Sequence, residues 1–343
     1  MTRRLHSFLV ILLGMALLLP ACAPASPDCR SEDVFCVGLV TEIGKINDRS
    51  FNQSCWQGLE RADQELGARI EYIETINVRD HRTNIATFAE EGFDVVVTCG
   101  FGIAQATLDS AELYPDTDFI GVDQFQTEPI KNLAGLVFPE DQAGFVVGAL
   151  AAMMSKSHRI GAVCGPDSVP PVWRLGAGFK AGAAYVDEKQ ETLTEALVVY
   201  HEGGSEAFLD PEWGAETARS MVNQGVDVVF GCGGLTGNGA IIAAAQADAY
   251  VIGVDTDQYL TLPEAALRML SSGLKLITPS VFELIRLSHE GNFPGGNYFG
   301  DIGYAPFHDL ENEVTADVRA EMELINAGLL DGSIETGVPP VKP

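Results

Sequence analysis

Short apolar runs separate longer amphipathic segments along most of the chain. Most of these runs are continuous and rich in valine and isoleucine, which is typical of strands buried on both faces of a parallel sheet. We therefore predict that the chain folds around parallel sheets. The ten predicted strands are 35–41, 69–74, 94–99, 118–122, 133–138, 159–164, 196–200, 227–231, 250–254 and 268–272.

Helical patterns of apolar residues fill the intervals between the runs. Strands that alternate with helices of this length indicate βαβ units with right-handed crossovers, and hence an α/β fold. The predicted helices are 51–66, 83–91, 103–113, 141–154, 172–187, 212–224, 238–247 and 278–289.

The alternation runs through the sequence twice. The series 36–138 has a counterpart in 159–255, and the same strand ending, Gly-Val-Asp, finishes at Asp123 in one and at Asp255 in the other. A chain of this length also exceeds one typical hydrophobic core. We predict two similar lobes, each built on a doubly wound parallel sheet.

The chain is expected to cross between the lobes several times. The late strand 268–272 and the helix 278–289 need a sheet to lie on, so the chain should return to the first lobe after Asp255. Several crossings form a hinge rather than a loose linker. The predicted division is 36–138 with 260–294 for one lobe, and 139–259 with 295–343 for the other.

The first residues carry the pattern of a lipoprotein signal peptide. Two arginines precede an apolar run over 8–19, which is shorter than the roughly 18 apolar residues of a membrane-spanning helix. The run leads into Leu-Pro-Ala-Cys, the form of a lipobox; an ordinary secretory signal with a chance cysteine is the alternative. We predict that residues 1–21 are removed, that lipid on Cys22 anchors the protein at the extracytoplasmic face of the membrane, and that 22–35 form a linker.

The formal net charge is −27. Nucleic acids and anionic lipids attract clusters of lysine and arginine, so this charge argues against both as direct partners. The acidity itself indicates solubility, or a saline or acidic habitat. A hydrophobic content of 46% excludes global disorder.

Six cysteines lie beyond the lipobox, and an even number outside the cytoplasm permits disulfides. Cys29 and Cys36 flank the start of the first predicted strand, so they are the first candidate pair. Cys99, Cys164 and Cys232 each end an apolar run, where a buried free thiol fits equally well. No CxxC or His/Cys cluster has the spacing of metal ligands, so no metal site is expected.

Ligands of open parallel sheets bind beyond the carboxyl ends of the strands, so the loops there form the candidate site. In the first loop, Ser50 and Gln53 have the form of a capping box, which predicts that a helix begins near Ser50. Phe51 then lies at the mouth of the lobe, where it could belong to the core or form a platform for a ligand. Asp123 ends a later strand, where its carboxylate could bind a ligand or only cap the next turn.

Two further loops contribute candidates. Loop 203–211 carries Phe208 just before a turn. Loop 231–239 is rich in glycine, so its backbone could approach a ligand closely, and Thr236 could cap the following helix. A phosphate cradle is a weak interpretation, because no lysine follows and the spacing matches neither GxxxxGK[ST] nor GxGxxG. The chain lacks G-x-S-x-G and H-E-x-x-H, so we expect neither catalysis nor a cofactor.

Several segments resemble motifs of the basic membrane protein family, the substrate-binding lipoproteins of ABC importers that include purine nucleoside receptors. The segments keep the family's order over about residues 36 to 310. Two of them depart from its pattern, because Arg49 replaces a lysine and Leu235 interrupts the usual G-G-T-G-N-G. The matching segments are 37–41, 47–54, 176–182, 233–239 and 252–259.

The resemblance implies a type I periplasmic-binding-protein fold and a site for a purine nucleoside. It implies that Phe51 and Phe208 sandwich the base. Asp123 and Asp255 then hold the ribose, and Lys275 completes the site beside them. The other matched positions that we predict to contact the ligand are Asp48, Asn52, Gly233 and Gly234.

The implied partners are a small-molecule ligand and the permease subunits of an ABC importer, with the protein acting as a monomer. A sugar or a signalling molecule bound by the same fold is the first alternative, and it would need the carboxylates but not both phenylalanines. A sensor that presents its ligand to a receptor kinase is the second. A nucleoside hydrolase is the third, but the sequence shows no aspartate cluster at one strand end to bind its metal.

Overall fold

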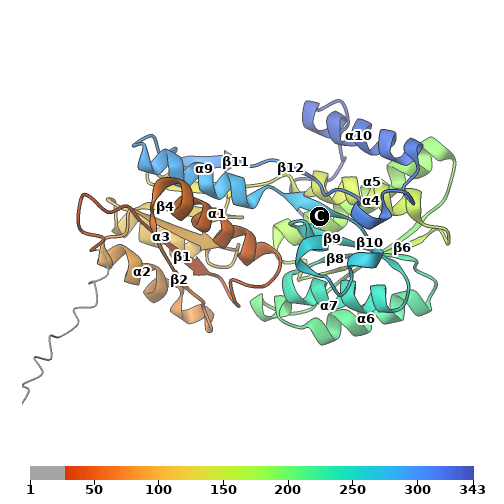
Figure 1. Cartoon of the computed structure of the whole chain (residues 1–343), viewed down its shortest axis with the longest axis horizontal. Coiled ribbons are helices and arrows are strands. Elements are labelled where there is room, and N and C mark those ends of the chain that lie inside the picture. Colours follow the sequence, from red (N-terminus) through yellow and green to blue (C-terminus); the bar gives the residue numbers. More distant parts are fainter. Residues whose placement is uncertain (1–27) are drawn as a thin grey trace, which may run out of the picture.

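The computed structural model describes residues 28–343, which form two α/β lobes (Figure 1). Each lobe is built on one six-stranded, almost entirely parallel sheet. The predicted fold class, two parallel-sheet lobes, is confirmed. The expected signal peptide, 1–21, and the lipidated Cys22 lie outside the described residues.

The sheet of the first lobe is parallel throughout, in the order β11-β5-β4-β3-β1-β2. Strands β1 and β3 are buried along their whole length, whereas β2 at the edge is partly exposed. Burial on both faces follows from the helices that cover them. The elements are β1 (Cys36–Thr41), α1 (Phe51–Leu66), β2 (Arg69–Ile73), α2 (His81–Glu91), β3 (Val95–Cys99), α3 (Ala104–Leu113), β4 (Asp118–Val122), β5 (Leu133–Val137), α9 (Ile277–His289) and β11 (Gly296–Phe299).

The second lobe repeats this plan with the order β12-β10-β9-β8-β6-β7, in which β12 runs antiparallel to β10. Its parallel strands point their carboxyl ends toward the first lobe (Figure 1). The elements are α4 (Glu140–Met154), β6 (Arg159–Cys164), α5 (Pro170–Gln190), β7 (Glu195–Tyr200), the 3-10 helix η2 (Ser205–Phe208), α6 (Pro211–Asn223), β8 (Val228–Cys232), α7 (Gly234–Gln246), β9 (Tyr250–Asp255), α8 (Gln258–Thr261), β10 (Met269–Lys275), β12 (Ile302–Tyr304) and α10 (Ala316–Asp331).

The chain crosses between the lobes from β5 to α4, from β10 to α9 and from β11 to β12. The predicted division is wrong in two places. Strand β10 was expected in the first lobe with 260–294, but it pairs with β9 in the second sheet. Strand β11 was expected in the second lobe, but it pairs with β5 in the first. The hinge therefore consists of three short connections that lie beside the cleft.

Helices α4 and α5 pack backbone to backbone in the second lobe. A Cβ atom on Gly144 would lie 2.1 Å from the carbonyl oxygen of Leu175, and one on Gly178 would lie 2.0 Å from that of Asp141. Only glycine allows this approach. The contact matters for the site because α4 begins at one of the lobe crossings and α5 begins at the wall of the cleft.

The six described cysteines form three disulfides. The predicted pair Cys29–Cys36 is confirmed, and it closes the described N-terminus onto the start of β1. The strand-end cysteines are paired rather than free, as Cys55–Cys99 and Cys164–Cys232. Among residues 28–343, no helix combines the length and apolar character needed to cross a bilayer.

Candidate functional site

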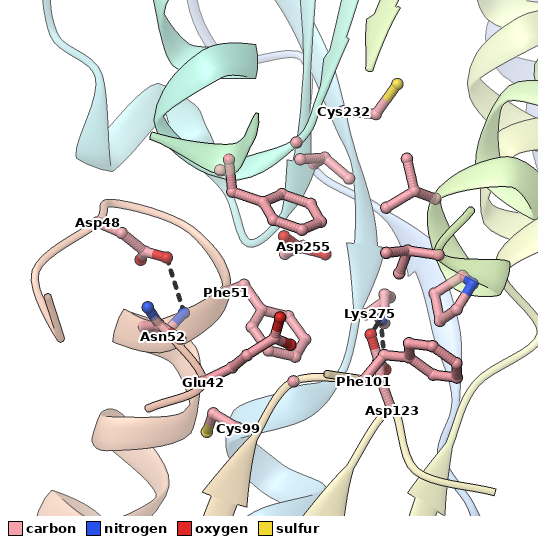
Figure 2. Close-up of a pocket in the computed structure, with 18 of the residues that line it drawn as sticks. Glu42, Asp48, Phe51, Asn52, Cys99, Phe101, Asp123, Cys232, Asp255 and Lys275 are labelled. Atoms are coloured by element: carbon pink, nitrogen blue, oxygen red, sulfur yellow. Dashed lines mark hydrogen bonds and ion pairs between the residues drawn. The ribbon is translucent and has the colours of Figure 1, made fainter. Parts of the chain in front are cut away.

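A cleft of about 700 Å³, part of it open to solvent, lies between the carboxyl ends of the two sheets (Figure 2). Its wall is mostly apolar and comes from both lobes. All nine residues that the sequence predicted as ligand contacts line this one cleft; that they bind a ligand stays a prediction. They are Asp48, Phe51, Asn52, Asp123, Phe208, Gly233, Gly234, Asp255 and Lys275.

The loop before α1 is ordered by Asp48 rather than by the predicted capping box. The Asp48 carboxylate accepts hydrogen bonds from the backbone N–H groups of Ser50, Asn52 and Gln53 at 2.9–3.0 Å. The Ser50 hydroxyl makes no cap and instead donates to Asp255 Oδ2, in the other lobe, at 2.8 Å. Burial outweighs these bonds and raises the pKa of Asp48 to about 6.

The side chains of Asp48 and Asn52 are thus occupied by their own loop. The Asn52 amide donates to the carbonyl oxygens of Ile43 and Lys45 at 3.1 and 3.2 Å. Both residues border the cleft, and their hydrogen bonds order the loop that leads into Phe51 in the first turn of α1.

Two phenyl rings reach the cleft from opposite lobes. Phe51 projects from α1 of the first lobe, and Phe208 ends the 3-10 helix η2 of the second. The Phe208 ring lies against Gly165, where a Cβ atom would be 2.6 Å from the ring. Thr236, predicted to cap α7, instead donates to the carbonyl oxygen of Ala207 at 2.7 Å and so holds the η2 segment.

Two aspartates occupy equivalent strand ends in the two lobes. Asp123 follows β4 and Asp255 ends β9, with backbone φ angles of 63° and 67°. This left-handed conformation is uncommon outside glycine and costs energy. It turns both carboxylates into the cleft, and burial raises the pKa of Asp255.

Lys275 lies between these acids at the end of β10. Its ammonium donates to both oxygens of Asp123, at 2.7 and 2.6 Å, and its side chain is only 2% exposed. Burial alone would lower the pKa of Lys275, but the surrounding carboxylates outweigh it and raise that pKa. The lysine is therefore a fixed positive charge, and it lies 5.1 Å from the centre of the Phe51 ring.

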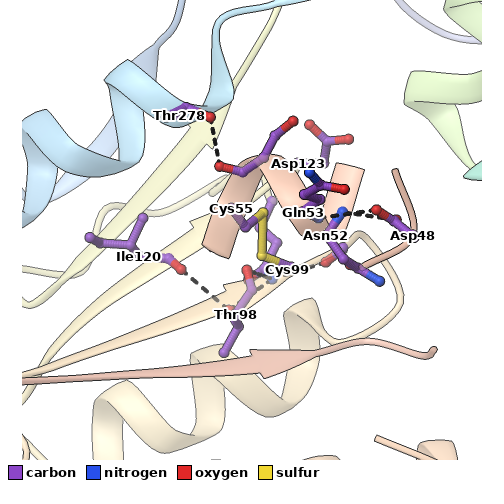
Figure 3. Close-up of a disulfide and its surroundings, with 12 residues drawn as sticks. Asp48, Asn52, Gln53, Cys55, Thr98, Cys99, Ile120, Asp123 and Thr278 are labelled. Atoms are coloured by element: carbon purple, nitrogen blue, oxygen red, sulfur yellow. Dashed lines mark hydrogen bonds between the residues drawn. A yellow bond between two sulfur atoms is a disulfide. The ribbon is translucent and has the colours of Figure 1, made fainter. Parts of the chain in front are cut away.

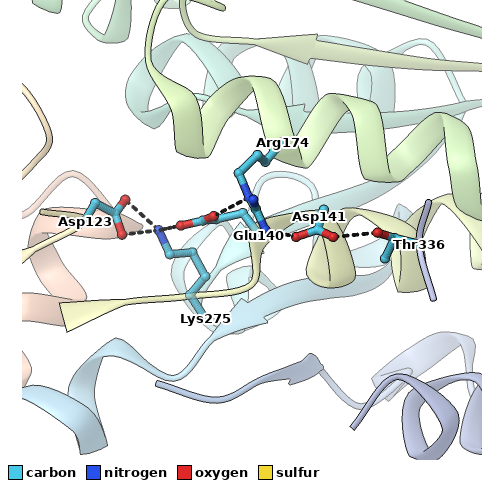
Figure 4. Close-up of polar contacts among 6 residues, drawn as sticks. All are labelled: Asp123, Glu140, Asp141, Arg174, Lys275 and Thr336. Carbon is cyan, nitrogen blue, oxygen red and sulfur yellow. Dashed lines mark hydrogen bonds and ion pairs between the residues drawn. The ribbon is translucent and has the colours of Figure 1, made fainter. Parts of the chain in front are cut away.

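A buried chain of charges extends from Lys275 into the second lobe (Figure 4). Glu140, the first residue of α4, lies 4.0 Å from the Lys275 ammonium and 3.1 Å from Arg174 of α5. Arg174 also pairs with Asp141, whose other oxygen accepts a hydrogen bond from Thr336 at 2.6 Å. Sequence analysis missed this chain. It links the cleft to the first crossover and to the C-terminal segment.

Raising the pH is expected to destabilise the protein through Glu140. Burial raises the pKa of this carboxyl from its ordinary 4.5 to about 7, against the opposing effect of Lys275. The folded protein therefore holds this proton more tightly, and the resulting stabilisation is complete below pH 4.5 and lost as the pH rises through 7. At about 1.4 kcal/mol per pKa unit, the loss is on the order of 3 kcal/mol.

Urea unfolding of the wild type and of Glu140→Gln at pH 5 and pH 8 measures this effect. The amide cannot ionise, so the variant should lose less stability than the wild type between these pH values. Equal losses in the two proteins would contradict the role of Glu140.

The carboxylate of Glu42 lies directly in the cleft, and the sequence analysis did not predict it as a site residue. It follows β1 and is 8% exposed. Oε1 accepts a hydrogen bond from Ser205 Oγ across the cleft, and Oε2 accepts one from Gly102 N at 2.6 Å. No described cation forms an ion pair with Glu42. It resembles Asp123 in coming directly after a buried strand, which was a signal available in the sequence.

Two sheet-built lobes, joined by three short connections and enclosing a cleft of aromatic and charged side chains, are typical of solute-binding proteins. Residues 35–298 match the family model of PnrA-like substrate-binding proteins of ABC transporters. The chain belongs to this family, as the motifs in its sequence predicted.

Comparison with known proteins agrees with this family. The chain is 28% identical to a CD4+ T-cell-stimulating antigen of Listeria innocua, over 98% of both chains. It is 29% identical to the ABC transporter nucleoside-binding protein BmpA of Lactococcus lactis, over 86% of this chain and 87% of that one. It is 29% identical to an uncharacterized lipoprotein of Pyrococcus abyssi, over 76% of this chain and 65% of that protein.

Solved structures show the same fold. A solute-binding protein of an ABC transporter system from Aeropyrum pernix superimposes with a TM-score of 0.79 at 24% identity, covering 88% of this chain and 92% of that one. A solute-binding protein of an ABC transporter system from Conexibacter woesei superimposes with a TM-score of 0.71 at 21% identity, covering 90% of this chain and 99% of that one. The protein is therefore a substrate-binding protein of an ABC transporter with a type I periplasmic-binding-protein fold.

Proposed function

We propose that the ligand of this binding protein is a purine nucleoside, captured between the two lobes and delivered to an ABC permease. The observation that carries the proposal is the pair Phe51 and Phe208, which reach the same cleft from opposite lobes. Two aromatic faces can enclose a flat base, at about 1–3 kcal/mol for each stacked face. The nucleoside-binding name of the Lactococcus lactis relative supports the same ligand.

The polar end of the cleft suits a ribose. Asp123 and Asp255 are acceptors for the two hydroxyls of a cis-diol, and each hydrogen bond to a charged group contributes about 1.5–3 kcal/mol. Lys275 provides the countercharge that buried carboxylates require. A sugar alone would use these groups but would leave the two phenyl rings without a partner.

Glu42 favours a base with N–H groups on its edge. A buried carboxylate without a described ion-pair partner accepts hydrogen bonds and cannot donate them while ionised. Guanine presents an N–H and an amino group side by side, whereas adenine presents one amino group beside an acceptor nitrogen. We therefore propose guanosine as a better ligand than adenosine.

The proposed cellular setting is the extracytoplasmic face of the membrane. Relatives named as lipoproteins, together with the lipobox, support an anchor on Cys22. We propose that the protein acts as a monomer, that the permease subunits are its protein partners, and that it binds its ligand without catalysing a reaction.

Titration calorimetry with a series of nucleosides tests the proposal. Guanosine should bind about 5- to 150-fold more tightly than deoxyguanosine, because a missing hydroxyl leaves part of a buried carboxylate unpaired at about 1–3 kcal/mol. Guanosine monophosphate should bind more weakly still, since its phosphate would meet Asp123 and Asp255 with Lys275 as their shared countercharge. The adenosine series and free ribose serve as matched comparisons.

Tighter binding of the monophosphates would refute the nucleoside proposal and would favour an anion site on the backbone of loop 231–239. Equal binding of ribose and guanosine would instead favour a sugar receptor, because the two rings would then contribute nothing.

A further inference from the structure

We propose that the two cleft disulfides are positioning elements, and that each holds one of the two phenylalanine rings at the separation a stacked base requires. Cys55–Cys99 would hold Phe51, and Cys164–Cys232 would hold Phe208. The inference rests on the proposed function for the identity of the ligand. The structural part of it, that each bond orders one ring-bearing segment, can be measured without any ligand.

In the first lobe, the disulfide joins helix α1, which carries Phe51, to the end of strand β3 (Figure 3). Cys55 lies one turn after Phe51 on α1, so the two side chains share a helix face. Cys99 ends β3 and itself borders the cleft. The Cys99 carbonyl accepts a hydrogen bond from Glu42 N at 2.8 Å. The Cys55–Cys99 disulfide therefore fixes α1 relative to the loop that carries Glu42.

In the second lobe, the disulfide joins two neighbouring strand ends beneath Phe208. Cys164 and Cys232 are register partners at the ends of β6 and β8, and Cys232 borders the cleft. Gly165 directly follows Cys164, donates to the Cys232 carbonyl at 2.8 Å and supports the Phe208 ring. The disulfide thus fixes the surface on which Phe208 lies.

Cys99 and Cys232 end corresponding strands, β3 and β8, on either side of one ligand site (Figure 2). Their partners differ, because Cys55 lies on helix α1 and Cys164 ends strand β6. The ring-bearing segments need such support because η2 is a single turn of 3-10 helix and Phe51 lies in the first turn of its helix. A binding surface that is ordered before the ligand arrives loses less conformational entropy on binding. We therefore expect the bonds to act on affinity as well as on fold stability.

The third disulfide provides a matched control. Cys29–Cys36 lies at the amino end of β1, away from the cleft. The test compares three double variants, each of which removes one disulfide. They are Cys55→Ala combined with Cys99→Val, Cys164→Val combined with Cys232→Ala, and, as the control, Cys29→Ala combined with Cys36→Val. Each valine refills part of the space that the two sulfur atoms leave, so that the variants fold. Guanosine affinity should fall roughly tenfold for each cleft pair and change less than about twofold for the control, although all three lose stability.

Hydrogen exchange in the absence of ligand separates this inference from the proposed function. Segment 51–58 should exchange faster only without Cys55–Cys99, and segment 205–210 only without Cys164–Cys232. If the wild type binds no nucleoside, the proposed function fails, and the exchange result still decides the role of the disulfides. Unchanged exchange in both segments, or an equal loss of affinity in the control, would overturn the inference.

Discussion

Lys275→Met is expected to abolish ligand binding and to lower the free energy of unfolding by about 3–5 kcal/mol at neutral pH, the usual cost of removing one partner of a buried ion pair. The Lys275 ammonium is the close cationic neighbour of Asp123 and also lies near Glu140. Without it these carboxylates repel one another in a poorly solvated cleft. The pKa of Glu140, which burial already raises, should rise further, so the loss of stability should be smaller at pH 5 than at pH 8.

Chemical unfolding at the two pH values and calorimetry with guanosine measure both effects. Lys189→Met is the matched control, because Lys189 pairs with Glu321 at the surface, where a pair contributes at most about 1 kcal/mol. A Lys275→Met protein as stable as the control variant would show that the buried acids do not depend on this lysine.

Removal of both phenyl rings is expected to eliminate measurable nucleoside binding. Phe51→Ala and Phe208→Ala should each weaken binding by about 1–3 kcal/mol, or 5- to 150-fold. The double variant should lose roughly the product of the two factors, since in the proposed complex the two rings stack on opposite faces of one base. Calorimetry with guanosine measures the loss.

Phe299→Ala controls for the loss of a phenyl ring as such, because Phe299 is 71% exposed on β11. Thermal melts decide between the two interpretations of Phe51. A large fall in melting temperature with unchanged affinity would mean that Phe51 belongs to the core and does not stack on the ligand.

The start of α1 shows both the reach and the limit of sequence reasoning. The apolar pattern predicted the helix over 51–66, and the structure has it there. The prediction of the capping residue was wrong, because Asp48 and Ser50 both have side chains that can cap the start of this helix. The choice between them is made by Asp255, 205 residues away in the other lobe, which takes the Ser50 hydroxyl. A tertiary contact of this kind is absent from any local pattern.

The site residues divide in the same way. Asp123 and Asp255 could be predicted because each ends a buried strand, and ligands of open parallel sheets bind beyond the carboxyl ends of the strands. The place of Glu140 in the site could not be predicted, because an acidic residue in the first turn of a helix is common at protein surfaces. Its burial arises only when β10 brings Lys275 beside it, and the pattern that predicts a strand over 268–272 does not say which sheet that strand joins.

The Cys29–Cys36 disulfide also limits the length of the tether that the proposed lipid on Cys22 would provide. It fastens the chain to the amino end of β1, on the side of the first lobe that faces away from the cleft. In the proposed lipoprotein, the backbone between Cys22 and Cys29 can span at most roughly 25 Å at about 3.6 Å per residue. Such a receptor stands with the back of its first lobe near the bilayer. We expect such a receptor to reach a permease by reorienting about its lipid anchor, because a tether of this length keeps the first lobe close to the bilayer.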